Sequence, residues 1–175
     1  MKFLKIDTES IENGPGIRIA VFFAGCLPNK CKAGNCPGCH NKIAQSFDVG
    51  DDYSSEIETY ILDKCNNPYI SGLTILGGEP YDQDEAQLVE LLKKFHIQNP
   101  DKTVWVYTGY EFEHIKDSAL TKYVDVAVVG PFILEQRDIS DANRWRGSTN
   151  QRVIDVKKSL QANKIIYLDG IPNNK

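Results

Sequence analysis

Four of the five cysteines lie within fourteen positions, at Cys26, Cys31, Cys36 and Cys39, directly after an apolar run at residues 17–23. Thiols at this density bind either a structural zinc ion or an iron-sulfur cluster. Their spacing, C-x4-C-x4-C-x2-C, leaves both possibilities open, because the usual zinc signature has two C-x2-C pairs and this chain has one. The segment from 26 to 45 is also rich in Gly, Pro, Asn and Lys, so it cannot pack a core alone and needs something around which to fold, which a metal would supply.

A second segment that could bind a ligand is Gly77-Gly78-Glu79-Pro80, which follows the apolar residues 73–76. Paired glycines allow the backbone to approach a ligand, and the Glu79 carboxylate is an acceptor for a cationic group. On its own this pattern is also typical of a simple turn. Both this segment and the cysteine segment follow predicted strands, and ligands bind at the carboxyl ends of strands in α/β sheets.

The elements that position these residues alternate between strands and helices. Strands are predicted at residues 3–6, 17–23, 73–76, 103–107, 124–129, 153–154 and 165–168, and helices at 53–65, 85–95, 112–123 and 157–162. A strand, a glycine loop and a helix recur about three times, which predicts an α/β fold with a parallel sheet wrapped by helices. The fifth cysteine, Cys65, ends a predicted helix and is expected to be a small buried hydrophobe. Residues 137–152 hold four arginines and are predicted to form a long loop.

Length and composition exclude several classes of protein. A chain of 175 residues is expected to form one domain and is too short for a complete eight-unit α/β barrel, which needs about 250 residues. A net charge of -4 argues against nucleic acid as a partner. No signal peptide or membrane-spanning segment is expected, since charged residues interrupt every apolar stretch. We therefore expect a cytoplasmic protein whose reduced thiols bind metal.

Motifs over nearly the whole chain carry a resemblance to a known family. They are N-G-P-G-I-R at 13–18, G-C at 25–26, C-P-G-C-H-N at 36–41, G-G-E-P at 77–80, T-G-Y at 108–110, G-P-F at 130–132, R-D at 137–138 and R-G-S-T-N-Q-R at 146–152. The chain resembles the radical S-adenosylmethionine (SAM) enzymes, and within them the glycyl-radical activating enzymes that serve the anaerobic ribonucleoside-triphosphate reductase. The last motif looks particular to this group. The resemblance implies a partial, open parallel βα barrel of the radical SAM type, built as a single compact domain over residues 1–175.

The resemblance also implies which residues hold the cofactors. Cys26, Cys36 and Cys39 would bind a [4Fe-4S] cluster and leave one iron open to SAM. The usual family spacing is C-x3-C-x2-C, whereas nine residues, 27–35, separate Cys26 from Cys36 here. Cys26 is preferred as the first ligand because it follows Gly25 directly at the strand end, as in the family. Cys31 lies within the insertion, where it is a spare thiol, a ligand in place of Cys26, or an occupant of the site when SAM is absent.

For SAM, the resemblance implies binding by Gly77, Gly78, Glu79 and Thr108, with the first three holding the methionine amino group. His40 would lie near the adenine, or alternatively cap the loop. A departure from the family pattern concerns Val129, since related activators tend to carry an acidic residue just before Gly-Pro-Phe. Asp125 could compensate only if the strand had a different register, because side chains four apart on a strand stand about 13 Å apart.

The activity implied is that of an oxidoreductase that cleaves SAM reductively to a 5'-deoxyadenosyl radical, which removes a hydrogen from a glycine of the reductase large subunit. The implied partners are this reductase and an electron donor such as reduced flavodoxin. In the arginine-rich loop, Arg146 and Arg152 are predicted to bind the partner, because planar guanidinium groups suit carboxylate recognition. Alternatively, the segment 137–152 helps to close over SAM or is a solvated loop. Two other functions stay open at this point: a small radical SAM enzyme acting on a purine-like molecule, similar to 7-carboxy-7-deazaguanine synthase, and a zinc-stabilised binding module.

Overall fold

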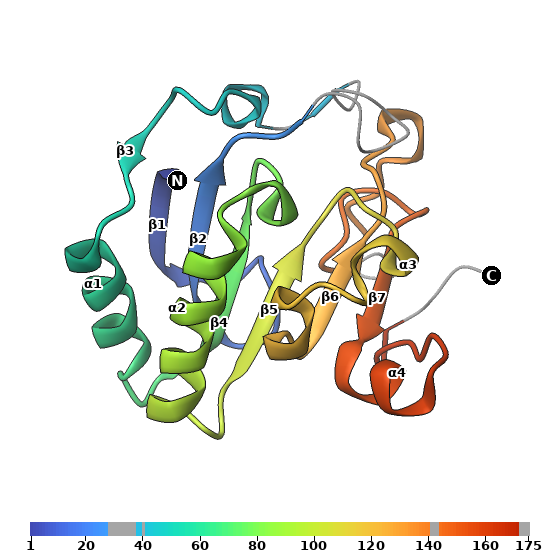
Figure 1. Ribbon diagram of the computed structural model, residues 1–175. Coiled ribbons are helices and arrows are strands. Elements are labelled where there is room, and N and C mark those ends of the chain that lie inside the picture. The colour runs from blue at the N-terminus through green and yellow to red at the C-terminus, as the bar shows by residue number, and fades with distance from the viewer. Residues whose placement is uncertain (28–37, 40, 141–143, 172–175) are drawn as a thin grey trace.

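The protein forms one open, seven-stranded mixed sheet in the order β3-β1-β2-β4-β5-β6-β7 (Figure 1). The computed structural model describes residues 1–27, 38–39, 41–140 and 144–171. The strands are β1 (Lys2–Ser10), β2 (Ile17–Ala24), β3 (Asp51–Asp52), β4 (Ile70–Gly77), β5 (Thr103–Tyr107), β6 (Val126–Val129) and β7 (Arg152–Asp155). The α-helices are α1 (Ser55–Cys65), α2 (Glu85–Gln98), α3 (Phe112–Ile115) and α4 (Val156–Ala162), and the 3-10 helices are η1 (Lys42–Gln45), η2 (Pro80–Asp82), η3 (Leu120–Tyr123) and η4 (Leu134–Gln136).

Four central strands, β2, β4, β5 and β6, are parallel, as the sequence predicts. The edges differ, because β1 and β3 are antiparallel to their neighbours and β7 is antiparallel to β6. The connection between β1 and β2 spans only residues 11–16, too few for the crossover that two parallel strands require. The sheet is therefore mixed, with its parallel part in the middle.

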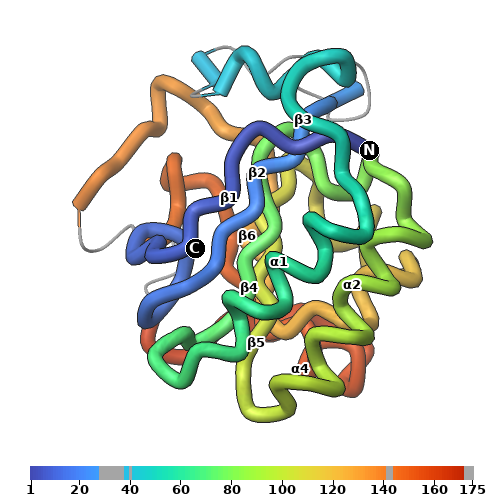
Figure 2. The backbone as a smooth tube through the Cα atoms, turned by 90° about the vertical axis from the view of Figure 1, so that its left-hand side faces the viewer, coloured from blue at the N-terminus to red at the C-terminus, as the bar shows by residue number. Residues whose placement is uncertain are grey.

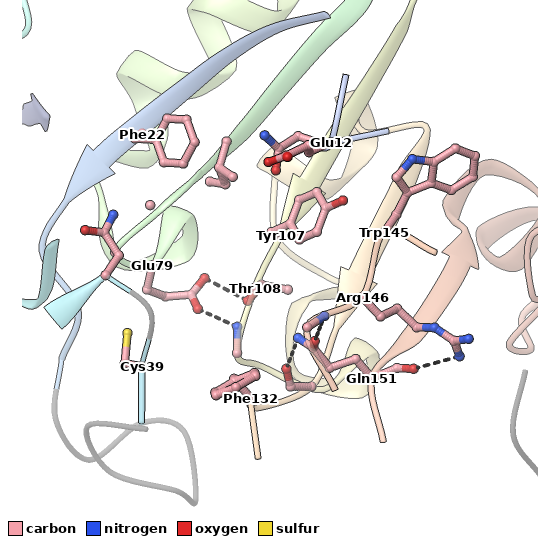
Figure 3. A pocket seen from close by; sticks show the side chains of 18 of the residues that line it. Glu12, Phe22, Cys39, Glu79, Tyr107, Thr108, Phe132, Trp145, Arg146 and Gln151 are labelled. Carbon is pink, nitrogen blue, oxygen red and sulfur yellow. Dashed lines mark hydrogen bonds between the residues drawn. The ribbon is translucent and has the colours of Figure 1, made fainter. Parts of the chain in front are cut away.

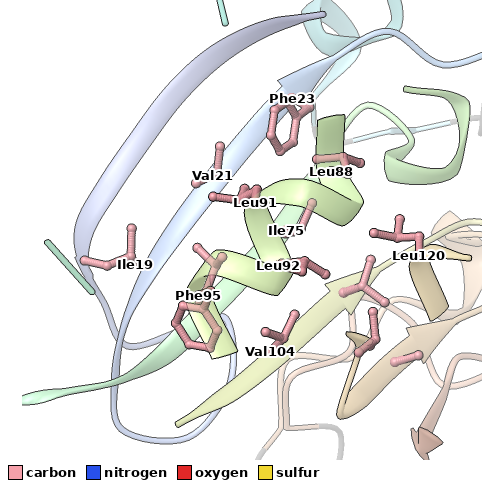
Figure 4. Close-up of a cluster of buried hydrophobic side chains, with 14 of the residues drawn as sticks. Ile19, Val21, Phe23, Ile75, Leu88, Leu91, Leu92, Phe95, Val104 and Leu120 are labelled. Atoms are coloured by element: carbon pink, nitrogen blue, oxygen red, sulfur yellow. The ribbon is translucent and has the colours of Figure 1, made fainter. Parts of the chain in front are cut away.

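One face of the sheet is covered by the helices and forms the main hydrophobic core (Figure 4). Residues 19, 21 and 23 of β2 alternate toward this face, and α2 packs its apolar stripe of Leu88, Leu91, Leu92 and Phe95 against them. Side chains of α1, α3, η3 and α4 join the same core. Cys65 is fully buried within it, which confirms the prediction for this residue.

The opposite face carries a second, smaller core of Trp105, Val126, Val128, Val153 and Ile171, against which Trp145 packs. Arg18 is fully buried on this face, and its guanidinium carbon Cζ lies 5.6 Å from the centroid of the Trp105 ring. Its guanidinium donates hydrogen bonds to the Thr74 hydroxyl (2.7 Å), the Leu73 carbonyl (2.9 Å), and the Thr103 carbonyl (2.7 Å) and hydroxyl (3.1 Å). Arg18 thereby ties β2 to β4 and β5 below the carboxyl edge of the sheet. Burial lowers its pKa to about 10.

Two sequence predictions about elements were wrong. The helix expected at 112–123 is broken into α3 and η3, because the Ser118 hydroxyl accepts the Leu120 backbone N–H (3.1 Å) and donates to Glu85 (2.5 Å) instead of continuing a helix. The strand expected at 165–168 is reduced to one bridge between Ile154 and Tyr167. Of the long loop expected at 137–152, the described residues 137–140 and 144–151 form no helix or strand, apart from one bridge between Arg137 and Ser148. None of the helices in the described part of the chain is long and apolar enough to cross a membrane.

Candidate functional site

A cavity of about 670 Å³ opens at the carboxyl ends of the parallel strands, on the face that the helices leave uncovered (Figure 3). The segments after β2, β4, β5 and β6 all contribute to its walls, as parallel strands require. The side chains of Phe22, Leu76 and Tyr107 line it within the sheet. The remaining wall residues are Ile11, Glu12, Asn13, Cys26, Cys39, Asn41, Gln45, Gly77, Gly78, Glu79, Thr108, Gly109, Gly130, Phe132, Asp138, Ile139, Ser140, Arg144, Trp145, Arg146, Gly147 and Gln151.

Two of the predicted metal ligands, Cys26 and Cys39, line this one cavity. Cys26 lies two residues after the end of β2, and its backbone N–H donates to the Gln45 carbonyl at 3.1 Å. The next N–H, of Leu27, donates to the Asp82 carboxylate at 2.7 Å. Cys31, Cys36 and His40 lie outside the described residues, so their predicted roles stay predictions. Within the described ranges no three His, Cys, Asp or Glu side chains gather as a metal site.

The paired glycines allow the ends of β4 and β2 to approach each other closely. A Cβ on Gly77 would stand 2.3 Å from the Phe23 carbonyl oxygen, and one on Gly78 would stand 2.2 Å from the Gly25 carbonyl oxygen. The backbone N–H groups use this proximity, since Gly78 donates to Phe23 and Glu79 donates to Gly25, both at 2.8 Å. The glycines therefore couple the turn after β4 to the start of the cysteine segment, in addition to forming part of the cavity wall.

Glu79 is the buried carboxylate of the cavity wall, with 1% of its surface exposed. Its Oε1 accepts hydrogen bonds from the Thr108 hydroxyl (2.7 Å) and the Tyr81 N–H (3.1 Å), and its Oε2 accepts the Gly109 N–H (2.8 Å). These bonds join the exits of β4 and β5 (Figure 3). A carboxylate has about four acceptor positions, so three donors leave room for one more.

Burial raises the pKa of Glu79 from 4.5 to about 7, and the hydrogen bonds from Thr108, Gly109 and Tyr81 oppose that rise. Asp82 nearby adds a smaller repulsion that raises the pKa of Glu79 further. A cationic group placed beside the carboxylate would favour its charged form. An ammonium group fits beside Glu79, because it can donate to the remaining acceptor position and its positive charge favours the ionised carboxylate.

The arginine-rich segment is anchored to the loop after β6. The Gln151 amide donates to the Gly130 carbonyl (3.0 Å) and accepts the N–H groups of Gly147 (2.8 Å) and Ser148 (3.2 Å). The Asn150 amide donates to the Pro131 carbonyl at 2.8 Å. The motif R-G-S-T-N-Q thus shapes a cavity wall through its amides.

The two arginines predicted to bind a partner make contacts or are buried within the chain, and their predicted role stays a prediction. Arg152 donates to Glu111 (2.5 Å) and Glu113 (3.2 Å), so its guanidinium already has carboxylate partners within the chain. Arg146 lines the cavity but is 7% exposed, and burial lowers its pKa.

Comparison with known proteins assigns the chain to a family. A family described as a 4Fe-4S single cluster domain matches residues 12–154. The anaerobic ribonucleoside-triphosphate reductase-activating protein of Enterobacteria phage T4 is 34% identical over 142 residues, which make up 81% of this chain and 85% of that protein. The chain belongs to this family of reductase-activating proteins. Relatives of the same name from Vibrio cholerae (36% identity, 81% of this chain and 89% of the relative) and Escherichia coli K12 (31%, 82% and 91%) agree. No solved structure matches.

At the position where activating proteins were expected to carry an acidic residue, Val129 is fully buried in the helix-side core and points away from the cavity. Asp125 does not replace it. That carboxylate lies at the opposite end of β6, where it accepts the Val104 N–H at 2.6 Å and pairs with Lys157. Among the described residues, the acidic side chains that line the cavity besides Glu79 are Glu12 and Asp138.

Sequence reasoning missed several residues that build the site of this activating protein. Asp82 accepts both the Leu27 N–H and the Tyr110 hydroxyl (2.8 Å), and therefore links the cysteine segment to the loop after β5. Gln83 donates to the carbonyls of Gly25 (3.0 Å) and Glu79 (3.1 Å). Polar side chains directly after Gly-Gly-Glu-Pro were the signal that could have identified them.

Proposed function

We propose that this chain is a radical SAM activase that installs a glycyl radical in an anaerobic ribonucleoside-triphosphate reductase. The observation that carries the proposal is the meeting of Cys26, Cys39 and Glu79 at one cavity, in a chain whose curated relatives bear the reductase-activating name. The open sheet with four parallel central strands is compatible with a partial βα barrel of the radical SAM type. We assign the whole chain to one such domain acting in the cytoplasm.

Cys26, Cys36 and Cys39 would hold a [4Fe-4S] cluster, with Cys31 as the alternative first ligand. Cys26 and Cys39 line one cavity whose wall also contains several glycines, and this arrangement supports the binding of such a cluster there. The family description, a 4Fe-4S single cluster domain, favours iron over the zinc alternative. Three thiolates would leave one metal position open, as in other catalytic metal sites.

SAM would bind beside the thiols, with Glu79 accepting its ammonium group through the remaining acceptor position. Gly77 and Gly78 would line the methionine part, Thr108 would hold Glu79 in place through its hydroxyl, and His40 would lie near the adenine. A carboxylate that already accepts three hydrogen bonds is fixed in orientation before the ligand arrives, which lowers the entropic cost of binding.

When bound, the two cofactors would supply the one-electron cleavage of a sulfonium and the removal of a hydrogen atom from a glycine Cα. The chain's own residues bind and orient the reacting groups and exclude water from them. Phe22, Leu76 and Phe132 contribute apolar walls for that exclusion. An electron donor such as reduced flavodoxin and the reductase large subunit complete the proposed reaction.

The test is anaerobic reconstitution of the purified chain with iron and sulfide, followed by SAM, a reductant and the reductase. Formation of 5'-deoxyadenosine and a glycyl radical signal in the reductase are expected. Cys26→Ser and Cys39→Ser should lose iron and both products, because each removes a ligand. Cys65→Ser is the matched control, since that thiol is buried in the helix-side core away from the cavity.

The competing functions give different outcomes in the same experiment. A zinc module would yield a colourless protein without absorbance near about 400 nm, which iron-sulfur clusters show. An enzyme acting on a purine-like molecule would form 5'-deoxyadenosine with that molecule and leave the reductase without a radical.

A further inference from the structure

The mouth of the cavity carries two highly exposed isoleucines from segments far apart in the sequence. Ile11 is 71% exposed and Ile139 is 87% exposed, and both line the cavity. Single exposed apolar side chains are common on protein surfaces. Two of them at the mouth of the one cavity that holds the candidate chemistry are a more specific observation, because apolar surface beside a binding site marks contact with a partner.

Structured turns present both isoleucines. Ile11 precedes Asn13, whose amide donates to the Ser10 hydroxyl at 2.8 Å and whose carbonyl accepts the Thr74 hydroxyl at 2.8 Å. Ile139 lies within a turn closed by the Ser140 N–H, which donates to the Asp138 carboxylate at 2.8 Å. Both turns lie on the side of the sheet away from α1 and α2 (Figure 2).

The two ends of the cavity differ in character. Cys39 and Glu79 lie at one end, and Glu12, Tyr107 and Trp145 gather at the other (Figure 3). The end with Cys39 and Glu79 would hold the two cofactors of the proposed function. The other end holds the two aromatic rings and the Glu12 carboxylate, and Glu12 is the next residue after Ile11, so a chain segment that enters past Ile11 can reach it.

Two arginines of this region are engaged within the chain, whereas the exposed Arg144 lines the cavity. Arg152 is already paired with Glu111 and Glu113, and Arg146 is buried. The cavity wall carries both signs of charge, because the carboxylates of Glu12 and Asp138 are next to the two isoleucines in sequence and the exposed Arg144 lines the same cavity. The feature of the mouth that suits an apolar segment is therefore its pair of exposed isoleucines.

We propose that Ile11 and Ile139 form a docking rim for the segment of the reductase that carries the target glycine. This inference rests on the proposed function, because only an activase must bring a glycine of another protein into this cavity. The segment enters extended, with apolar side chains on either side of the glycine resting on the two isoleucines. The glycine itself, which has no side chain, reaches furthest into the cavity.

The test measures glycyl radical formation as a function of reductase concentration for Ile11→Ser, Ile139→Ser and the double variant. A purified anaerobic reductase that the wild-type chain activates serves as substrate. Each single variant should raise the KM for the reductase about tenfold and leave kcat within about twofold, because each loses the burial of one isoleucine side chain. The double variant should raise KM about a hundredfold if the two contacts are independent.

Ile97→Ser is the matched control, because Ile97 is 80% exposed at the end of α2, on the helix-covered face. It should leave KM unchanged. An equal KM for the Ile11, Ile139 and Ile97 variants and the wild type would overturn the docking rim while leaving the activase function intact. A wild-type chain that forms no radical in any reductase would instead overturn the proposed function on which the rim rests.

Discussion

Burial of Glu79 should make the stability of the cofactor-free protein fall as pH rises. Its pKa is raised from 4.5 to about 7, so between these values the folded chain holds a proton that the unfolded chain has lost. The stabilisation is fully present below about pH 4.5 and is lost as pH rises to about 7. The size of the pKa change corresponds to about 3 kcal/mol in the free energy of unfolding.

The assay is urea unfolding of the cofactor-free wild type and Glu79→Gln at pH values from about 5 to 8. The glutamine is neutral at every pH, so its curve should lack this slope, and the difference between the two proteins isolates the contribution of Glu79. Adding SAM to the reconstituted wild type should reduce the slope, because an ammonium group beside the carboxylate lowers its pKa.

A matched control is Glu90→Gln, since the Glu90 side chain is 55% exposed and the substitution removes the same charge. Its pH dependence should follow that of the wild type. If the difference between wild type and Glu79→Gln changed by less than about 1 kcal/mol over this range, the account of a desolvated carboxylate would be refuted.

Three further substitutions test the remaining contacts of the site. Gly78→Ala places a methyl group 2.2 Å from the Gly25 carbonyl oxygen, so the ends of β2 and β4 must separate, and activase turnover should fall about a hundredfold. Arg18→Met removes a guanidinium that makes four hydrogen bonds, and urea unfolding should show a loss of about 3 kcal/mol. Asp82→Ala removes the acceptor of the Leu27 N–H, and iron titration should show binding weakened about tenfold.

Controls separate these effects from general damage. Gly147→Ala also adds a methyl group at the cavity, but its nearest neighbour is the Phe132 side chain at 3.0 Å, which can rotate away. Lys5→Met is the control for Arg18→Met, because it removes an exposed cation. Asp101→Ala is the control for Asp82→Ala, because it removes an exposed carboxylate. Variants of Gly78, Arg18 and Asp82 that behaved like these three controls would contradict the structural account.

Much of the fold follows from local sequence pattern. The strand at residues 103–107 was predicted with the bounds that β5 has, because an apolar run between polar residues and a glycine defines both ends. The meeting of Cys26 and Glu79 was also predictable, since parallel strands deliver their carboxyl ends to one edge. Periodicity and this topological rule together predicted that the two segments meet, whereas the roles of their residues were implied by the resemblance to the family.

The remaining features depend on contacts between residues distant in sequence. Arg152 forms an ion pair with Glu111, which lies forty-one residues earlier in the sequence. No local sequence pattern could therefore show that the Arg152 guanidinium has a carboxylate partner within the chain. The buried position of Arg18 depends on carbonyls and hydroxyls of β4 and β5. The interruption of the predicted helix by Ser118 required the Glu85 carboxylate, thirty-three residues away, as a partner.

The helices that join the main core pack on one side of the sheet, and in the described chain loops cover the smaller core on the other side and leave the cavity open there. α/β domains with parallel strands usually bury both sides of the sheet with helices. A reductase docked over the cavity would extend the loop layer and would dry the cavity at the moment of reaction. Assembly with the target, rather than folding alone, would then complete the architecture and shield the radical from solvent.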